Sequence, residues 1–201
     1  MSDPVIEFWF DFGSNYSYLS ASRIEAAAQA AQVQVRWRPF LLGPIFKRLG
    51  WSSSPFVEQK EKGEYVWRDM ERLALKYGVP WRRPTTFPRA AVYPMRVAVA
   101  YQEQPWVGAF CTRVMALNFA HDRDIHSNEV AAEVLQALGL DGERLVAEAQ
   151  DHKARLREQS EEAARRRIFG APTFFVGEEM FWGNDRLEDA LAWARARGGA
   201  P

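Results

Sequence analysis

The pattern of apolar and polar residues at the start of the chain predicts a buried strand that runs directly into a helix. Residues 5–10 are almost all apolar and rich in aromatic side chains, which is typical of a strand buried on both faces. Gly13 ends that strand, and Ser14 and Asn15 are good N-cap residues for the segment that follows. Apolar residues then recur at helical spacing, at Ile24, Ala27, Ala28 and Ala31. The chain therefore turns from a strand into a helix at Ser14.

A second strand completes a strand–helix–strand unit. Residues 33–38 alternate between apolar and polar side chains, the period-two pattern of a strand with one face in water. Two strands joined by a helix in so short a segment should pair in parallel through a right-handed crossover. Pro39 then ends the second strand.

From residue 41 to about residue 164 the sequence predicts helices separated by breakers and no convincing strand. Ser54 and Pro55 form a helix start, because a cap residue precedes a proline at the first helical position. Gly63 is a candidate break in this helix. The apolar stripe of this predicted helix lies at Trp67, Met70, Leu73, Ala74 and Tyr77, and the helix is expected to end at Gly78. Further helices are predicted around residues 106–117, from Ser127 to Gly139, and over residues 141–167 with Gly170 as the stop.

A proline-rich segment interrupts this helical block. Residues 78–94 contain four prolines, at Pro80, Pro84, Pro88 and Pro94, and predict an extended, stiff loop. Loops of this length inside compact domains are often functional.

The end of the chain predicts a hairpin and a closing helix. Residues 173–176 and 180–182 are short apolar strands around a turn at residues 177–179. Asn184 or Asp185 is expected to cap the last helix, whose apolar stripe lies at Leu187, Ala190, Leu191 and Ala194. The sequence therefore predicts an α/β fold, with a four-stranded sheet assembled from the two ends of the chain and an all-helical insertion between them.

The turn at Ser14 is the strongest candidate for chemistry. At the amino end of a helix, unpaired N–H groups and the helix dipole favour an anion. Ser14 and Ser17 also have the spacing of a Cys-x-x-Cys redox pair, with hydroxyls in place of thiols. A hydroxyl can donate a hydrogen bond or be activated as a nucleophile, but it cannot exchange disulfides. Taken alone, the segment leaves open that Ser14 only caps the helix.

Composition narrows the function classes. The 201 residues contain 26 basic and 26 acidic side chains, so no global field attracts nucleic acid or an acidic membrane. The single cysteine, Cys111, lies in an apolar helical pattern and indicates a core thiol without an internal disulfide. His121, His126 and His152 show no metal-ligand spacing. The start of the chain lacks signal-peptide features and no apolar run has membrane-spanning length, so we expect a cytoplasmic protein.

The predicted order of elements resembles a thioredoxin fold with an inserted helical domain. Residues 14–17 (Ser-Asn-Tyr-Ser) lie where that fold carries its active-site turn. Pro172 precedes the third predicted strand, where the fold carries a cis-proline. The resemblance implies a discontinuous thioredoxin-like domain over residues 1–42 and 166–201. Residues 43–165 would form the helical insertion, whose last helix is a candidate for packing on the sheet.

Three short motifs narrow the resemblance to the 2-hydroxychromene-2-carboxylate isomerases. They are residues 10–14 (Phe-Asp-Phe-Gly-Ser), 169–173 (Phe-Gly-Ala-Pro-Thr) and 181–186 (Phe-Trp-Gly-Asn-Asp-Arg), and they occur in the family's order. These glutathione-dependent enzymes belong to the kappa-class glutathione transferase branch of DsbA-like thioredoxin folds. One departure is Asn15, because the family often has proline after the serine.

The resemblance implies a glutathione site. Ser14 would be the catalytic residue, and it would stabilise the thiolate of bound glutathione. An ordinary thiol has a pKa of about 8.5, and lowering it by about two units would stabilise the thiolate by roughly 2.7 kcal/mol. The backbone at Ala171 and Pro172 would pair with the cysteinyl part of glutathione. The γ-glutamyl end would be held by Trp182, Gly183, Asn184 and Asp185.

The resemblance also implies an acceptor site between the sheet and the insertion. Lys47 lies near the family's lysine that meets the substrate carboxylate, although Phe46 is the strict match in spacing. Phe87 matches a substrate-facing aromatic position. The implied reaction is thiolate addition to a conjugated enone, bond rotation and elimination, in the breakdown of aromatic compounds. The resemblance further implies a homodimer and a small aromatic carboxylate as substrate.

Two other functions remain open at this stage. A kappa-like glutathione transferase or peroxidase would use the same site on other electrophiles. A binding module of thioredoxin fold would keep the groove without turnover. Dithiol oxidoreductase chemistry is poorly supported, because the chain lacks the cysteine pair.

Overall fold

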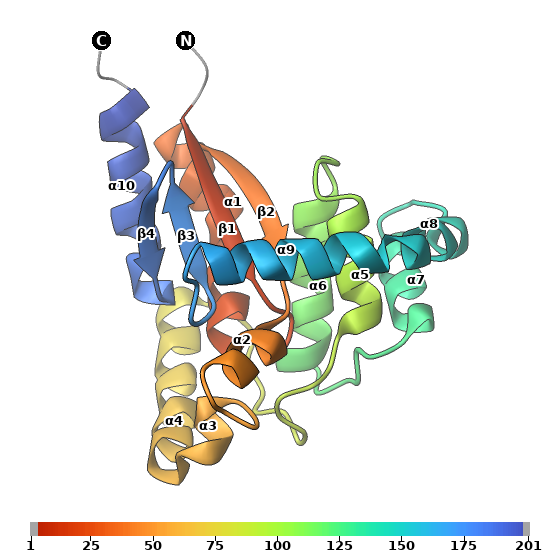
Figure 1. The fold of residues 1–201 in the computed structure, drawn as a ribbon, viewed down its shortest axis with the longest axis horizontal. Helices are drawn as coiled ribbons and strands as arrows, with labels where there is room; N and C mark the ends of the chain where they lie inside the picture. Colours follow the sequence, from red (N-terminus) through yellow and green to blue (C-terminus); the bar gives the residue numbers. More distant parts are fainter. Residues whose placement is uncertain (1–3, 199–201) are drawn as a thin grey trace.

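The predicted strand–helix–strand unit is present at the start of the chain. In the computed structural model, which describes residues 4–198, its elements are β1 (Val5–Phe10), α1 (Asn15–Ala31) and β2 (Gln34–Pro39) (Figure 1). β1 and β2 pair in parallel, with Phe8 opposite Trp37. The first and last three residues of the expected thioredoxin-like domain lie outside the described residues.

The two ends of the chain form one four-stranded sheet. β3 (Thr173–Val176) pairs antiparallel with β1, and β4 (Glu179–Trp182) pairs antiparallel with β3. The strand order is β2-β1-β3-β4, so the sheet is mixed and β1 is central. The predicted hairpin is confirmed, although β4 begins at Glu179, which the sequence placed in the turn.

The chain between β2 and β3 contains helices and connecting segments. These helices are α2 (Leu42–Arg48), α3 (Pro55–Glu58), α4 (Lys60–Tyr77), α5 (Val92–Ala100), α6 (Val107–Phe119), α7 (Asn128–Gln136), α8 (Gly142–Ala149), the 3-10 turn η1 (Gln150–His152) and α9 (Lys153–Arg165). After β4 follow the 3-10 turn η2 (Asn184–Arg186) and α10 (Leu187–Gly198). Within residues 4–198, no helix combines the length and apolar character that crossing a bilayer requires.

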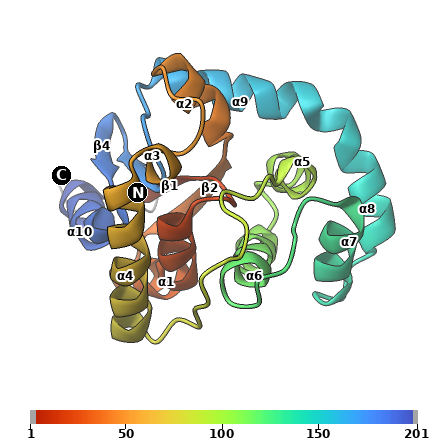
Figure 2. The ribbon, with the colours of Figure 1, turned by 90° about the horizontal axis from the view of Figure 1, so that it is seen from below.

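Helices cover both faces of the sheet (Figure 2). Phe8 and Phe10 of β1 belong to the main core, which also contains buried residues of α1, α5, α6 and α10. Trp9 points to the opposite face, where it packs in a second cluster with Ile45 of α2 and Ala163 of α9. The prediction that the first strand is buried on both faces is therefore confirmed, and α9 lies across the sheet (Figure 1).

Three predicted helix boundaries are wrong. The helix after Ser54 breaks at Gln59, and Gly63 lies inside α4. The absence of a side chain at Gly63 permits close contact with α3, because a Cβ there would meet the Phe56 carbonyl oxygen at 2.1 Å. The proline-rich loop ends before Pro94, because proline is tolerated in the first turn of a helix and α5 begins at Val92. The charged region over residues 141–167 divides into α8, η1 and α9, and ends ahead of Gly170.

The predicted cap of the last helix is also wrong. The N-cap of η2 is Gly183, and neither Asn184 nor Asp185 caps this segment through its side chain. Gly183 has a φ of 115°, a backbone conformation that favours glycine. The side chains of Asn184 and Asp185 are therefore available for other contacts.

Candidate active site

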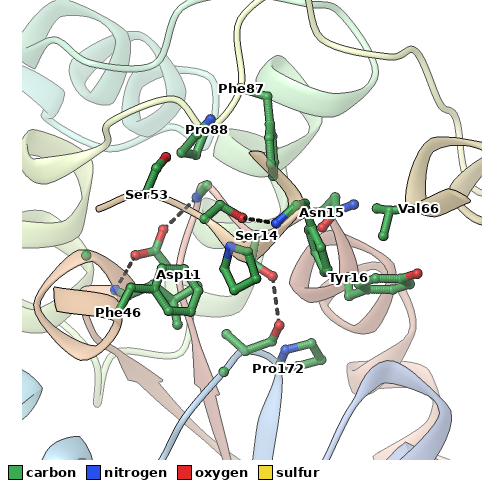
Figure 3. A pocket seen from close by; sticks show the side chains of 18 of the residues that line it. Asp11, Ser14, Asn15, Tyr16, Phe46, Ser53, Val66, Phe87, Pro88 and Pro172 are labelled. Carbon is green, nitrogen blue, oxygen red and sulfur yellow. Dashed lines mark hydrogen bonds between the residues drawn. The ribbon is translucent and has the colours of Figure 1, made fainter. Parts of the chain in front are cut away.

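A cavity of about 1030 Å³ opens where β1 ends. One side, here called the sheet wall, comprises the turn residues 13–16 together with residues 169–172 and 182–186. The other side, the helical wall, comprises lining residues of α2, the segment 52–56, α4 and the loop segment 87–92. Figure 3 shows Ser14 near the centre, with Phe87 and Pro172 on opposite sides of it. The sheet wall therefore comes from the two ends of the chain, and the helical wall comes from its middle.

Ser14 is the N-cap of α1, as predicted. Its Oγ accepts a hydrogen bond from the Ser17 N–H (3.2 Å) and donates one to the Ala171 carbonyl oxygen (2.9 Å). The side chain is nearly buried but belongs to the cavity lining. Capping thus occupies one acceptor position of the hydroxyl, while its proton points across the cavity floor to the segment before β3.

Asp11, to which the sequence pattern assigned no role, fixes the turn that carries Ser14. Its Oδ1 accepts from the Gly13 N–H (2.7 Å), and its Oδ2 accepts from the Leu42 N–H (2.8 Å) (Figure 3). Burial raises the pKa of the Asp11 carboxyl, and the two backbone hydrogen bonds act in the opposite direction. The carboxyl therefore ties the β1–α1 turn to the first residue of α2.

The peptide bond between Ala171 and Pro172 is cis, as predicted from the motif. Both residues line the cavity, and Figure 3 shows Pro172 beneath Ser14. The Pro172 carbonyl accepts a hydrogen bond from the Gly183 N–H (3.0 Å), which brings the exit of β4 to the same place.

The four residues from Trp182 to Asp185 all line the cavity. The Trp182 ring packs on Phe169, and its Nε1 lies so close to Gly170 that a Cβ there would be 2.5 Å away. Asn184 is buried, and its Oδ1 accepts from Ser20 Oγ (3.2 Å) and Arg23 Nη2 (3.0 Å).

Two buried amides at this wall have unpaired atoms. The Asn184 Nδ2 has no hydrogen-bond partner among the described residues. Asn15 is fully buried, and neither its Nδ2 nor its Oδ1 has a partner in this part of the chain. Unpaired buried polar atoms are costly, at about 1–3 kcal/mol each, so both positions require an explanation.

One face of α4 forms much of the helical wall. Lys62, Tyr65, Val66, Asp69 and Leu73 line the cavity at helical spacing. Tyr16 Oη donates to Asp69 Oδ2 (2.7 Å) and joins this face to α1. Burial, followed by the hydrogen bond to Asp69, raises the pKa of Tyr16, so its phenol stays protonated and acts as a donor. The helical periodicity of α4 was visible in the sequence, but not which face meets the cavity.

Of the two residues expected to bind the acceptor, Phe87 lines the cavity and Lys47 does not. Phe87 lines the cavity and packs edge-on against Trp67, with ring centroids 4.7 Å apart. Lys47 is exposed on α2 and is absent from the lining, whereas Phe46 belongs to it. Adjacent residues of a helix point about 100° apart, and the rotation of α2 turns Phe46 toward the cavity and Lys47 toward solvent. The strict spacing match, Phe46, is the one that the fold turns inward.

A buried ion pair supports the loop that carries Phe87. Arg89 Nη2 donates to Asp122 Oδ1 (2.6 Å), and the side chains are only 7% and 8% exposed. Arg89 also donates to Asn118 Oδ1 (2.9 Å). The hydrogen bond from Arg89, with that from the Thr85 N–H, lowers the pKa of Asp122 to about 2. No local sequence pattern indicates this pair, because its members belong to separate loops.

The fold and the site together define the structural class of this protein. A mixed four-stranded sheet, a helix that starts at the serine turn, a cis-proline before β3 and a helical insertion are the features of a DsbA-like thioredoxin fold. A family model described as a DSBA-like thioredoxin domain matches residues 5–192.

Comparison with known proteins narrows this class. The chain is 30% identical over 190 residues to 2-hydroxychromene-2-carboxylate isomerase of Pseudomonas putida, covering 91% of this chain and 90% of the relative. It is 26% identical over 200 residues to glutathione S-transferase kappa 2 of Caenorhabditis elegans, covering 91% and 88%. A solved 2-hydroxychromene-2-carboxylate isomerase superposes with a TM-score of 0.80 at 28% identity, covering 96% and 95%. The chain therefore belongs to the DsbA-like thioredoxin family, in the branch of the 2-hydroxychromene-2-carboxylate isomerases and kappa-class glutathione transferases.

Proposed function

We propose that this protein is a glutathione-dependent isomerase of 2-hydroxychromene-2-carboxylate-type aromatic compounds. The observation that carries the proposal is the position of Ser14. Its hydroxyl lines the cavity at the amino end of a 17-residue helix and lies within hydrogen-bond distance of the segment before β3. The amino end of a helix favours an anion. Two relatives that match most of the chain are named 2-hydroxychromene-2-carboxylate isomerase, which supports the isomerase function.

The sheet wall fits glutathione. The unpaired Nδ2 of the buried Asn184 can donate to the α-carboxylate of a γ-glutamyl group, and the exposed Asp185 can accept from its ammonium. Ala171 accepts a hydrogen bond from Ser14 and Pro172 accepts one from Gly183, and both would pair with the cysteinyl backbone. Trp182 and Gly183 would complete this end of the site.

The role of Ser14 in this reaction is to donate a hydrogen bond to the glutathione sulfur. Glutathione, when bound, supplies a thiolate that adds reversibly to a conjugated enone and so permits rotation about the former double bond. The Ser14 hydroxyl can redirect its proton from the Ala171 carbonyl to the sulfur, and the amino end of α1 favours the negative charge. No histidine or carboxylate partner is required for this role, in contrast to a serine hydrolase.

The helical wall would hold the acceptor. Phe87 and Phe46 provide aromatic surface, and Tyr16, whose phenol donates to Asp69, lies at the boundary between the walls. This arrangement suits a flat aromatic compound placed over Ser14.

A kappa-like glutathione transferase or peroxidase is the second candidate, favoured by the similarity to the kappa enzymes. It would use the same sheet wall and release a conjugate or disulfide. Further parts of the proposal are a homodimer, a cytoplasmic location, a role in aromatic catabolism, and a division into a thioredoxin-like domain (1–42 and 166–201) and an insertion (43–165).

The test is turnover. The protein is incubated with glutathione and 2-hydroxychromene-2-carboxylate, and isomerisation is followed by absorbance. Ser14→Ala should reduce turnover at pH 7 by roughly 25-fold, because the thiolate fraction falls from about three quarters to about 3% when the thiol pKa returns from about 6.5 to about 8.5. Ser17→Ala is the matched control, because Ser17 is buried in the same helix but absent from the cavity lining. Bound glutathione without isomerisation by the unmodified protein would favour the transferase.

A further inference from the structure

Asp11 holds the backbone on both sides of the cavity. Its carbonyl oxygen accepts a hydrogen bond from the Ser14 N–H at 3.0 Å, and its Oδ1 accepts from the Gly13 N–H at 2.7 Å. Its Oδ2 accepts from the Leu42 N–H at 2.8 Å, at the first residue of α2. An ionised carboxylate accepts on both oxygens and donates on neither. The same side chain therefore contacts the turn of the sheet wall and the first helix of the helical wall.

The start of α2 depends on this contact. The N-cap residue, Leu41, makes no side-chain capping hydrogen bond. The first N–H groups of a helix have no acceptor within the helix, and the Leu42 N–H is one of them. Phe46, which lines the cavity, follows Leu42 by about one helical turn. The Asp11 carboxylate thus fixes the end of α2 from which Phe46 is placed.

The turn before Ser14 has little room to move. A Cβ at Gly13 would lie 2.9 Å from the Arg89 carbonyl oxygen and 3.2 Å from Asp11 Oδ1. Gly13 is therefore packed between the Asp11 carboxyl and the Arg89 backbone. Ser14 follows directly, and its Oγ lies 2.9 Å from the Ala171 carbonyl oxygen. The direction of the hydroxyl depends on where Asp11 holds this turn.

We infer that Asp11 is a positioning residue that holds the Ser14 hydroxyl and the first turn of α2 in one arrangement. It acts on the glutathione thiolate through Ser14 and on the aromatic acceptor through Phe46. The assignment deepens the proposed function, on which it rests for the identity of the two ligands. The negative charge of Asp11 has the opposite effect, because a carboxylate in the cavity lining disfavours a nearby thiolate. Positioning and direct charge therefore predict shifts of opposite sign when Asp11 is neutralised.

The first test titrates the ultraviolet thiolate absorbance of the glutathione complex in Asp11→Asn. The amide keeps the shape of the side chain but has one acceptor oxygen, so one of the two N–H groups loses its partner. The midpoint should rise by about one unit, which is half the shift assigned to Ser14. In the Ser14→Ala background the same change should raise it no further. Asp141→Asn, which removes a carboxylate that caps α8 outside the cavity lining, should leave the midpoint unchanged.

The second test breaks the contact with α2 and leaves Asp11 in place. Leu42→Pro removes the N–H from which Asp11 accepts, at the first helical position, where proline is tolerated. Leu42→Ala removes the same side chain and keeps the N–H. The KM for the acceptor should be roughly fivefold higher in Leu42→Pro than in Leu42→Ala, with the thiolate midpoint equal in both. This comparison decides the α2 contact even where Asp11→Asn does not fold.

An unchanged or lower midpoint in Asp11→Asn would overturn the inference, because the carboxylate would then act through its charge alone or not at all. An equal rise with and without the Ser14 hydroxyl, or equal acceptor KM values in the two Leu42 variants, would also overturn it. Absent isomerisation, with the Ser14-dependent shift retained, would reject only the proposed function. Absence of a glutathione complex in the unmodified protein would overturn both, since Asp11 would have no thiolate to act on.

Discussion

The two walls of the cavity are built in different ways. On the sheet wall, backbone geometry fixes the positions: Ser14 caps α1, the Ala171–Pro172 bond is cis, and Gly183 turns the chain at a φ of 115°. On the helical wall, side chains from α2, α4 and a loop supply the surface. The first construction depends on the backbone conformation at Ser14 and Gly183, whereas the second depends on which side chains the helices and the loop carry.

This difference suggests a division of labour. The sheet wall would hold glutathione and control its sulfur, and the helical wall would select the acceptor. Substitutions on the two walls should then affect different measured constants. The predictions that follow test this separation.

Apart from Ser14, the largest effect is expected at Asp185, on the sheet wall. Asp185→Asn removes the negative charge offered to the γ-glutamyl ammonium, and glutathione affinity should fall roughly tenfold, within the range for a charged hydrogen bond. Calorimetric titration measures it. Asp189→Asn is the matched control, since Asp189 also pairs with Arg186 but is absent from the cavity lining. Equal losses in both variants would contradict the assignment.

A smaller, several-fold effect is expected at Phe87, on the helical wall. Phe87→Ala removes an aromatic ring of the cavity lining, and the pair that this ring would form with an aromatic acceptor contributes about 0.5–1.5 kcal/mol. The KM for the aromatic acceptor should therefore rise roughly two- to tenfold, with glutathione affinity unchanged. Phe87→Leu, which keeps an apolar side chain, should recover part of the loss. A change in glutathione affinity would show that the walls are not separate.

Asn15 tests the backbone control of the sheet wall through stability. Ser14 has φ −87° and ψ 115°, which is the conformation that a residue before proline adopts, and position 15 is the first of α1. Asn15→Pro also removes two unpaired buried atoms. Denaturant unfolding should show a gain of about 1 kcal/mol in the free energy of unfolding. Asn15→Ala should give a smaller gain, and a loss in the proline variant would contradict the account.

The smallest effect concerns the loop under Phe87 and is confined to acid pH. Hydrogen bonds from Arg89 and from Thr85 lower the pKa of Asp122 from 3.8 to about 2, so the ionised carboxylate stabilises the fold above its ordinary pKa. That contribution should be lost as the pH falls from about 4 to about 2. The stability difference between the unmodified protein and Asp122→Asn, measured by urea unfolding, should shrink over this window. A constant difference would exclude the pair as its cause.

The same contrast explains what could be predicted from the sequence. Ser14 and Pro172 were found because a cap and a strand-start proline are local signals. The prediction that Asn184 caps the last helix was wrong because Gly183 is the N-cap residue. The side-chain amide of Asn184 contacts Ser20 of α1 instead. The choice between Phe46 and Lys47 needed the rotation of α2, and the Arg89–Asp122 pair needed two distant loops to meet. Neither is encoded in a local pattern.

The central claim is that Ser14 stabilises the thiolate of bound glutathione. The direct measurement is a pH titration of the ultraviolet thiolate absorbance of the protein–glutathione complex, with Ser14→Ala and Ser17→Ala beside it. The account predicts a midpoint about two units below the ordinary thiol value of about 8.5 for the unmodified protein and Ser17→Ala, and a return toward that value in Ser14→Ala. The same midpoint in the unmodified protein and Ser14→Ala would contradict it.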